Sequence, residues 1–285
     1  MTKNLIAVLA ATMTTASMAV VDITGNYEGT FTDGNPGAAS YAQDLDLTLV
    51  GTSGASTVTV MMEDLTGGTA VTANQVFVET AIEGIALKAG NYKNQNGSGL
   101  MQKKSAVTNQ FEVSTSIAGA GITLGQVSEA SKVTVDASLE VAELDVTVQN
   151  VTATDRFITV VANFLGLGVT AETQNTTVGR NTAVSATTNV GALTATTVVI
   201  DVNDATAMSQ DDGILGDIST AVNGKKVVGG VLSTATTIGT VTGKAFEMND
   251  AMNYTGEIER GALTVGYTKA DNTAGVTTAK INVSF

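Results

Sequence analysis

Apolar and polar residues alternate one by one along much of this chain. The clearest stretches are residues 44–50, 133–141 and 144–150, where Leu, Val or Ala at every second position alternate mostly with Asp, Glu, Ser, Thr or Gln. A two-residue period is typical of a β-strand with one apolar and one polar face. Such stretches recur from residue 20 onward, so we predict an all-β chain. Residues 156–163 and 194–202 are apolar at both parities.

The connections between these strands alternate in length. Those after even-numbered strands are tight and rich in Gly, as at 83–84, 118–119 and 259–261, which is typical of β-hairpins. Those after odd-numbered strands are longer and polar, at 33–40, 64–74, 93–110, 174–182, 201–224 and 270–275. We predict about 16–18 antiparallel strands. The count stays open because residues 227–248 show no firm boundaries.

The last seven residues of the chain form a strand that ends on an aromatic ring. Apolar Ala279, Ile281, Val283 and Phe285 alternate with Lys280, Asn282 and Ser284. This ending resembles the closing strand of bacterial outer-membrane β-barrels. In that family a terminal Phe, preceded by alternate apolar residues, is a signal for the barrel-insertion machinery. The resemblance implies that Ile281, Val283 and Phe285 carry this signal, and it covers fewer than ten residues.

The resemblance also implies a fold and a function. The fold is an antiparallel up-and-down transmembrane β-barrel with short periplasmic turns and longer extracellular loops. The function is that of a porin, a water-filled channel through which small hydrophilic solutes or ions diffuse. The partners implied are outer-membrane lipid, the solutes, the insertion machinery and two further copies in a homotrimer. The alternative is a secreted or surface structural β protein, such as a surface-layer, fibre or virion decoration subunit.

The composition removes most other function classes. Among 285 residues there are 30 Gly and one Pro, and Cys, His and Trp are absent. Thiol chemistry, imidazole catalysis and His or Cys metal sites are therefore excluded, and we expect neither an enzyme nor a cofactor. A net charge of −13 argues against nucleic acid as a partner. The lack of Trp also disfavours a carbohydrate-binding sandwich.

The N-terminus has the features of a secretory signal. A basic start at Lys3, a short apolar run over 5–11 and small residues at Ser17 and Ala19 predict a signal peptide over 1–19, which leaves 20–285 as the pore domain. The alternative is an N-terminal helix of the mature protein. No later stretch has the roughly 20 apolar residues of a membrane helix, so any crossing uses strands. We expect the outer membrane of a Gram-negative bacterium, or else the cell surface.

Most of the twelve aromatic residues fall near strand ends, although Tyr27 lies mid-strand. Clustering at strand ends favours an interfacial girdle, while an aromatic content of 4% is sparse for one. Phe164 and Phe285 lie at the tight-turn edge. The nine near the longer connections are Phe31, Tyr41, Phe77, Tyr92, Phe111, Phe157, Phe246, Tyr254 and Tyr267.

Ten acidic residues occupy the polar face of the predicted strands. In a barrel they would line the lumen and favour cations, whereas in a soluble sheet they would be an ordinary solvated face. They are Asp44, Asp46, Glu79, Glu112, Asp136, Glu140, Asp145, Glu172, Glu257 and Glu259.

Residues 93–110 follow the fifth predicted strand and carry Lys93, Lys103 and Lys104. In general porins the loop after the fifth strand folds inward and narrows the pore. The resemblance therefore implies a constriction whose basic residues face the acidic wall. The characteristic loop motif of the family is not recognisable here, so a plain exposed loop is the alternative.

Acidic residues also crowd the connection 201–224. Asp201, Asn203, Asp204, Asp211, Asp212 and Asp217 lie there, but residues 201–206 lack the oxygen ligand and the Gly that a calcium-binding EF-hand loop requires. We expect a solvated acidic loop with a short helix at 213–222.

Overall fold

The computed structural model describes residues 20–34, 39–63, 65, 73–102, 105–127, 133–150, 156–208, 213–271 and 273–285. The predicted signal peptide over 1–19 lies outside these residues, so its prediction stays open. No helix in the described ranges is long and apolar enough to cross a membrane.

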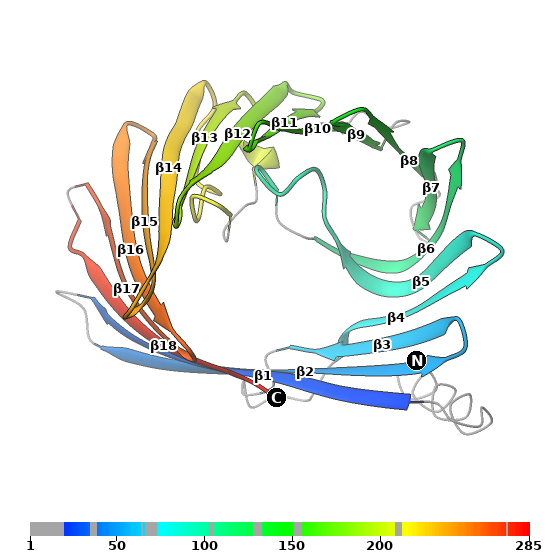
Figure 1. The fold of residues 1–285 in the computed structure, drawn as a ribbon, viewed down its shortest axis with the longest axis horizontal. Coiled ribbons are helices and arrows are strands. Elements are labelled where there is room, and N and C mark those ends of the chain that lie inside the picture. The colour runs from blue at the N-terminus through cyan, green and yellow to red at the C-terminus, as the bar shows by residue number, and fades with distance from the viewer. Residues whose placement is uncertain are drawn as a thin grey trace.

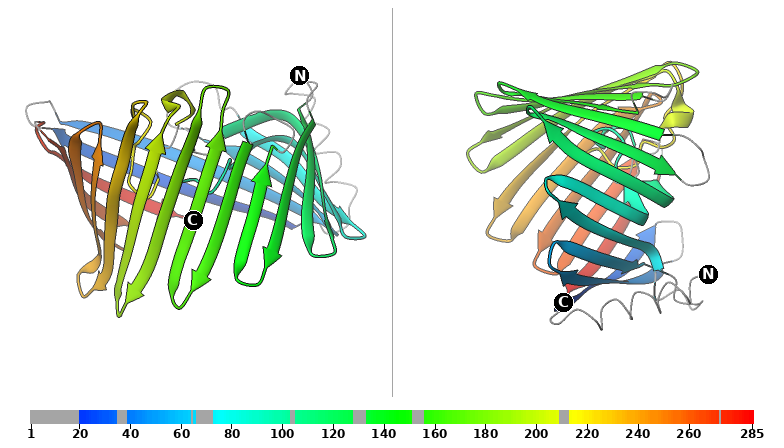
Figure 2. Two further views of the ribbon diagram at one scale, coloured as in Figure 1. Left: turned by 90° about the horizontal axis from the view of Figure 1, so that it is seen from above. Right: turned by 90° about the vertical axis from the view of Figure 1, so that its right-hand side faces the viewer.

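The described chain forms one antiparallel sheet of 18 strands that closes on itself. Each strand pairs with its neighbour in sequence, and β18 pairs with β1. Figure 1 shows the closed ring, and Figure 2 shows the strands inclined to its axis. The strands are β1 (Val20–Gly34), β2 (Ser40–Ser53), β3 (Ser56–Met62), β4 (Ala73–Ile82), β5 (Ile85–Asn94), β6 (Ser105–Ile117), β7 (Ala120–Val127), β8 (Val133–Val141), β9 (Leu144–Gln149), β10 (Arg156–Phe164), β11 (Leu167–Asn175), β12 (Arg180–Val190), β13 (Leu193–Val202), β14 (Lys225–Thr236), β15 (Gly239–Met248), β16 (Ala251–Arg260), β17 (Leu263–Ala270) and β18 (Val276–Ser284).

The barrel prediction is confirmed, with 18 as the strand count. The stretch whose boundaries the sequence left open forms β14 and β15, which pair as a hairpin. Ring closure leaves no second sheet for the described strands to pack against, so a sandwich is excluded. Closure also pairs the two outermost strands, which in an open sheet would present unsatisfied backbone groups.

Turn chemistry explains the alternation of connections. The connections after even-numbered strands have two residues each. At 83–84, Glu83 and Gly84 have φ of 50° and 84°, the left-handed conformation that two-residue hairpins require. The connections after odd-numbered strands are longer, as predicted, with one exception. The turn between β15 and β16 is only Asn249-Asp250, both at positive φ.

One face of every strand points out of the ring, and large apolar side chains on it are exposed. Examples are Ile23, Leu124, Leu139, Val184 and Ile281, which are 44–62% exposed. Soluble monomers rarely expose a continuous apolar band of this extent. The outer face therefore has the properties of a surface that contacts lipid.

The aromatic girdle is only partly as predicted. Phe31, Tyr41, Phe111, Tyr254 and Tyr267 are exposed on the outer face, at 44–62%. Four others lie on the inner face instead, because their register partners are inward-facing residues of the neighbouring strands. These four are Phe77, Tyr92, Phe157 and Phe246. Tyr92, Phe157 and Phe246 are at most 7% exposed.

Candidate functional site: the barrel interior

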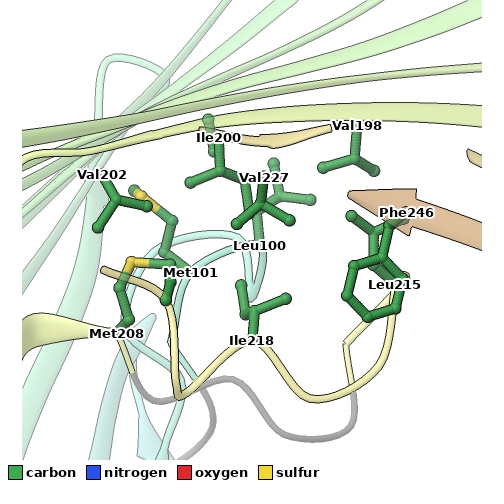
Figure 3. Close-up of a cluster of buried hydrophobic side chains, with 12 residues drawn as sticks. Leu100, Met101, Val198, Ile200, Val202, Met208, Leu215, Ile218, Val227 and Phe246 are labelled. Atoms are coloured by element: carbon green, nitrogen blue, oxygen red, sulfur yellow. The ribbon is translucent and has the colours of Figure 1, made fainter. Parts of the chain in front are cut away.

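The register carries one inner face around the whole ring. Phe246 points inward within a buried cluster (Figure 3) and pairs with Asn253, so alternate residues of β16 face inward as well. Following the register from strand to strand returns to Ala183 on β12, another member of that cluster. All ten acidic residues predicted for the polar face lie on this inner face. That they set ion selectivity stays a prediction.

The sequence reasoning missed further charges on the inner face. Asp22 and Glu28 of β1 lie there, although the alternation of Asp22, Thr24, Asn26 and Glu28 was a visible signal. Lys280 of β18 forms an ion pair with Glu28 at 3.1 Å. Across the lumen-facing surface, such lysines offset only part of the acidic charge.

Lys88 of β5 is a second basic residue on the inner face. Its Nζ lies 3.0 Å from a carboxylate oxygen of Glu79 and 4.4 Å from the ring centroids of both Phe77 and Tyr92. The two rings meet edge to face with centroids 5.7 Å apart. Cation–π contact accounts for these two aromatic rings beside the charged pair.

The connection after β5 enters the ring and reaches the opposite wall (Figure 1). The Gly97 N–H donates to Oε1 of Gln149 on β9 at 2.5 Å, and the Ser98 N–H donates to the carboxylate of Glu172 on β11. Gln149 Nε2 in turn donates to the Gln95 carbonyl at 3.2 Å. These bonds link the loop to two strands far away in the sequence, so the loop divides the lumen.

Of the three basic residues predicted for this constriction, Lys93 lies in β5 itself and not at the inner tip of the loop. Lys93 forms a 2.7 Å ion pair with Glu63, the residue that follows β3. The hydrogen bond from Lys93 holds the pKa of the Glu63 carboxyl below its usual value, against the opposing effect of burial. Lys103 and Lys104 lie outside the described residues. Their position relative to the acidic wall stays a prediction.

The connection after β13 also folds into the lumen. Met208, Leu215, Ile218 and Ala221 pack against the inner face of β12–β15, and the tip of the β5–β6 loop completes the cluster (Figure 3). Its wall members are Ala183, Val198, Ile200, Val202, Val227 and Phe246, and its tip members are Leu100 and Met101. The expectation of a solvated loop is therefore wrong for these residues. The physical reason is that an apolar inner wall has to be covered.

The two loops also contact each other through polar groups. Gln102 Nε2 donates to the Ala207 carbonyl at 2.8 Å. Ala207 ends the single turn of 3₁₀-helix η1 (Ala205–Ala207). The helix predicted at 213–222 is absent, since the described residues 213–222 form bends and turns.

Asp204 fixes the start of the second loop. Its carboxylate accepts from Thr206 Oγ1 at 2.6 Å and Thr176 Oγ1 at 2.7 Å. These hydrogen bonds lower the pKa of Asp204, and the bond from Thr206 has the larger effect. The buried Asn181 accepts from the Asn203 and Asp204 N–H groups, both at 2.8 Å. Asp211 and Asp212 lie outside the described residues, and among the described ones no three acidic side chains converge as a metal site requires.

On the other side of the β5–β6 loop the lumen is open and polar. A cavity of about 360 Å³ separates the base of this loop from β6–β9. Cavities of about 410 Å³ and 370 Å³ lie beside it. The first shares Ser114, Thr123, Asp136 and Gln149 with it, and the second shares Glu112 and Ser114. Together they follow the inner wall along β3–β9. The lumen therefore has a dry side and a polar side.

No family model and no curated protein sequence matches this chain. Solved structures do match. A mutant of the Rh. blastica porin has a TM-score of 0.56 at 12% identity, over 93% of this chain and 100% of that one. The chain has the fold of bacterial porins. A mutant of OccD1 (OprD) has a TM-score of 0.61 at 9% identity, over 96% and 98% of the two chains. At these identities the likeness to porins concerns the fold alone.

Proposed function

We propose that this protein is an outer-membrane porin, a water-filled channel for passive diffusion of small hydrophilic solutes and ions. The observation that carries the proposal is the contrast between the two faces of one closed ring. The outer face exposes apolar side chains such as Ile23 and Ile281, and the inner face carries the acidic residues. In lipid every backbone group has to pair within the protein, which a closed barrel achieves. A barrel of this strand number encloses water.

The channel favours cations on this proposal. Acidic side chains outnumber lysines on the inner face, and two of the lysines, Lys88 and Lys280, are already paired with Glu79 and Glu28. A negative lumen lowers the barrier for positive ions and raises it for negative ones. The acidic wall consists of the ten acidic residues predicted for the polar face of the strands, from Asp44 to Glu259.

The width of the channel depends on the two loops inside it. The dry cluster around Ile218 and Met101 fills the side next to β12–β15, so passage follows the polar side along β3–β9. The β5–β6 loop is the constriction. The loop after β13 packs against it on the side next to β12–β15. Exclusion of solutes by size follows from this arrangement.

The biogenesis of the protein is part of the same proposal. The signal peptide over 1–19 directs export, and the closing strand with Ile281, Val283 and Phe285 is recognised by the barrel-insertion machinery. The mature barrel resides in the outer membrane of a Gram-negative bacterium. A homotrimer is the expected assembly, by resemblance to porins.

Two experiments test the proposal. Fractionation should recover the protein in the detergent-extracted outer membrane, with a gel mobility that changes on heating as closed barrels unfold. Proteoliposomes should swell in isotonic solutions of small sugars, at a rate that falls as the sugar becomes larger. Soluble release, or assembly into fibres or lattices, would contradict the proposal, as would vesicles that never swell.

A further inference from the structure

The polar cavity of about 360 Å³ lies on the route that the proposed channel leaves open. Its volume is many times the ~30 Å³ share of a water molecule in the liquid, so it has room for a small solute together with water. It is lined by Asn94, Gln95, Asn96, Gln110, Glu112, Ser114, Thr123, Thr134, Asp136, Gln149 and Asn150.

Five side-chain amides that line this cavity each donate to an acceptor within the protein, namely those of Asn94, Gln95, Asn96, Gln110 and Gln149. Asn94 Nδ2 donates to Glu112 at 3.0 Å and to Gln110 at 3.3 Å, and Gln110 Nε2 donates to Glu112 at 2.5 Å. Gln95 Nε2 donates to the carbonyls of Asn96 and Gln102 at 2.9 and 2.8 Å. The amide groups of Asn96 and Gln149 likewise donate to protein oxygens.

The rest of the lining is rich in oxygen atoms. Glu112 and Asp136 contribute two carboxylates, and hydroxyls from β6–β8 surround them. The Asp136 Oδ1 accepts from the Asn150 N–H at 2.8 Å, which holds the carboxylate in place. None of the described residues that line the cavity is basic. A ligand that fits this chemistry is positively charged and brings its own hydrogen-bond donors.

We infer that this cavity is a binding subsite for small organic cations with N–H donors, such as ammonium and guanidinium groups. No three acidic groups of the described residues converge as in a typical metal site. A zwitterion with its own carboxylate is disfavoured, since that carboxylate would be repelled by Glu112 and Asp136. The inference rests on the proposed channel for its role in transport, while binding itself is independent of conduction.

Selectivity between two cations of equal charge tests the donor requirement. Guanidinium and tetramethylammonium carry the same charge, but only guanidinium has N–H groups. With the full-length protein in planar bilayers under bi-ionic conditions, the permeability ratio should exceed the ratio of their mobilities by about fivefold, the factor that one net hydrogen bond supplies. The Asp136→Asn variant keeps the oxygen that accepts from Asn150 and should lose most of this excess.

A matched variant separates the subsite from the general charge of the lumen. Glu257 also lies on the inner face, on β16, and is not among the residues that line the cavity. Glu257→Gln removes one charge, as Asp136→Asn does, and should leave the guanidinium preference intact. An equal loss in both variants would overturn the inference. So would a preference that survives Asp136→Asn, which would indicate exclusion of tetramethylammonium by size alone.

Equilibrium binding distinguishes failure of the subsite from failure of the channel. Saturation-transfer NMR on the detergent-solubilised full chain should detect methylammonium binding that Asp136→Asn abolishes and Glu257→Gln retains. Binding without any conductance would contradict the proposed function and leave the subsite in place. Conductance without such binding would overturn the subsite.

Discussion

Gly25 and Phe285 close the barrel. The Gly25 N–H donates to the Phe285 carbonyl at 2.8 Å, and the Phe285 N–H donates to the Gly25 carbonyl at 3.0 Å. The ring of Phe285 lies where a Cβ on residue 25 would be, 2.3 Å from its Cζ. The last residue of the chain therefore pairs with the first strand, and Gly25 makes room for its side chain.

Loss of the Phe285 ring should impair assembly of the barrel. We expect Phe285→Ala to reduce the fraction of protein that reaches the folded, heat-modifiable form, because the ring packs at the β1–β18 seam. Phe164→Ala is the matched control, since both rings are 63% exposed and lie near the tight-turn edge, while Phe164 lies away from the seam. The measurement is the folded fraction on unheated gels. Equal losses in both variants would show that apolar area alone matters, not the seam.

A side chain at Gly90 should destabilise the barrel. Gly90 has φ of +134°, and a Cβ there would lie 2.2 Å from the Val76 carbonyl oxygen. It precedes the irregularity in β5 that ends at Tyr92. We expect Gly90→Ala to lower the free energy of unfolding by about 2 kcal/mol or more, since neither backbone can move away without disturbing the ladder.

The control for this prediction is Gly243→Ala. Gly243 lies within β15, and nothing is within 4 Å of a Cβ built on it. Urea unfolding in lipid vesicles measures both variants. A Gly90→Ala protein as stable as the Gly243→Ala protein would contradict the backbone contact described here.

The dry side of the lumen should resist chemical labelling. The natural chain contains no Cys, so single cysteines report their own surroundings. Val198 and Thr196 are successive inward positions of β13, and Val198 is 2% exposed beneath the two loops. We expect a water-soluble thiol reagent to modify Val198→Cys at least about tenfold more slowly than Thr196→Cys, the factor that corresponds to ~1.4 kcal/mol of local opening. Similar rates would mean that the loop after β13 does not cover the wall.

The ion pair between Lys93 and Glu63 should contribute stability that depends on pH. Because the pKa of Glu63 is lowered in the folded protein, the contribution is present above its unfolded-state pKa of about 4.3. It is lost as the pH falls through the lower folded-state pKa. We expect Glu63→Gln to lower the free energy of unfolding by about 0.5 kcal/mol at pH 7. Below the folded-state pKa of Glu63 the substitution should leave that free energy unchanged.

The pair between Lys225 and Asp250 provides the comparison. Its side chains are 45% and 71% exposed, against 37% and 24% for Lys93 and Glu63. We therefore expect Asp250→Asn to have a smaller effect at every pH. Unfolding curves at several pH values measure both. A pH-independent effect of Glu63→Gln would rule out the charge as its cause.

The sequence predicts the strands of the barrel wall better than it predicts the loops that pack inside the lumen. The two-residue period of stretches such as 133–141 determines both the strands and the faces they present. The closing strand is also predicted correctly, because the alternate apolar residues that lead to Phe285 can be recognised within a few neighbouring positions. A period of two does not state which of two apolar faces meets lipid, so the sequence alone wrongly assigns the inward Phe246 and Phe157 to the girdle.

The packing inside the lumen depends on contacts between distant segments. Nothing near residues 208–221 shows that Met208 and Ile218 meet the wall, or that Ser98 reaches Glu172. One signal was present: residues 194–202 are apolar at both parities. A strand with two apolar faces in a barrel requires a cover on its inner side, and the longer connections are long enough to supply one.

Single-channel recording in planar bilayers tests the central claim most directly. Purified full-length protein should give stepwise, ohmic conductance increments in potassium chloride, with a reversal potential in a salt gradient that shows preference for potassium over chloride. A folded, membrane-inserted protein that gives no increments would contradict the account of an open, polar lumen.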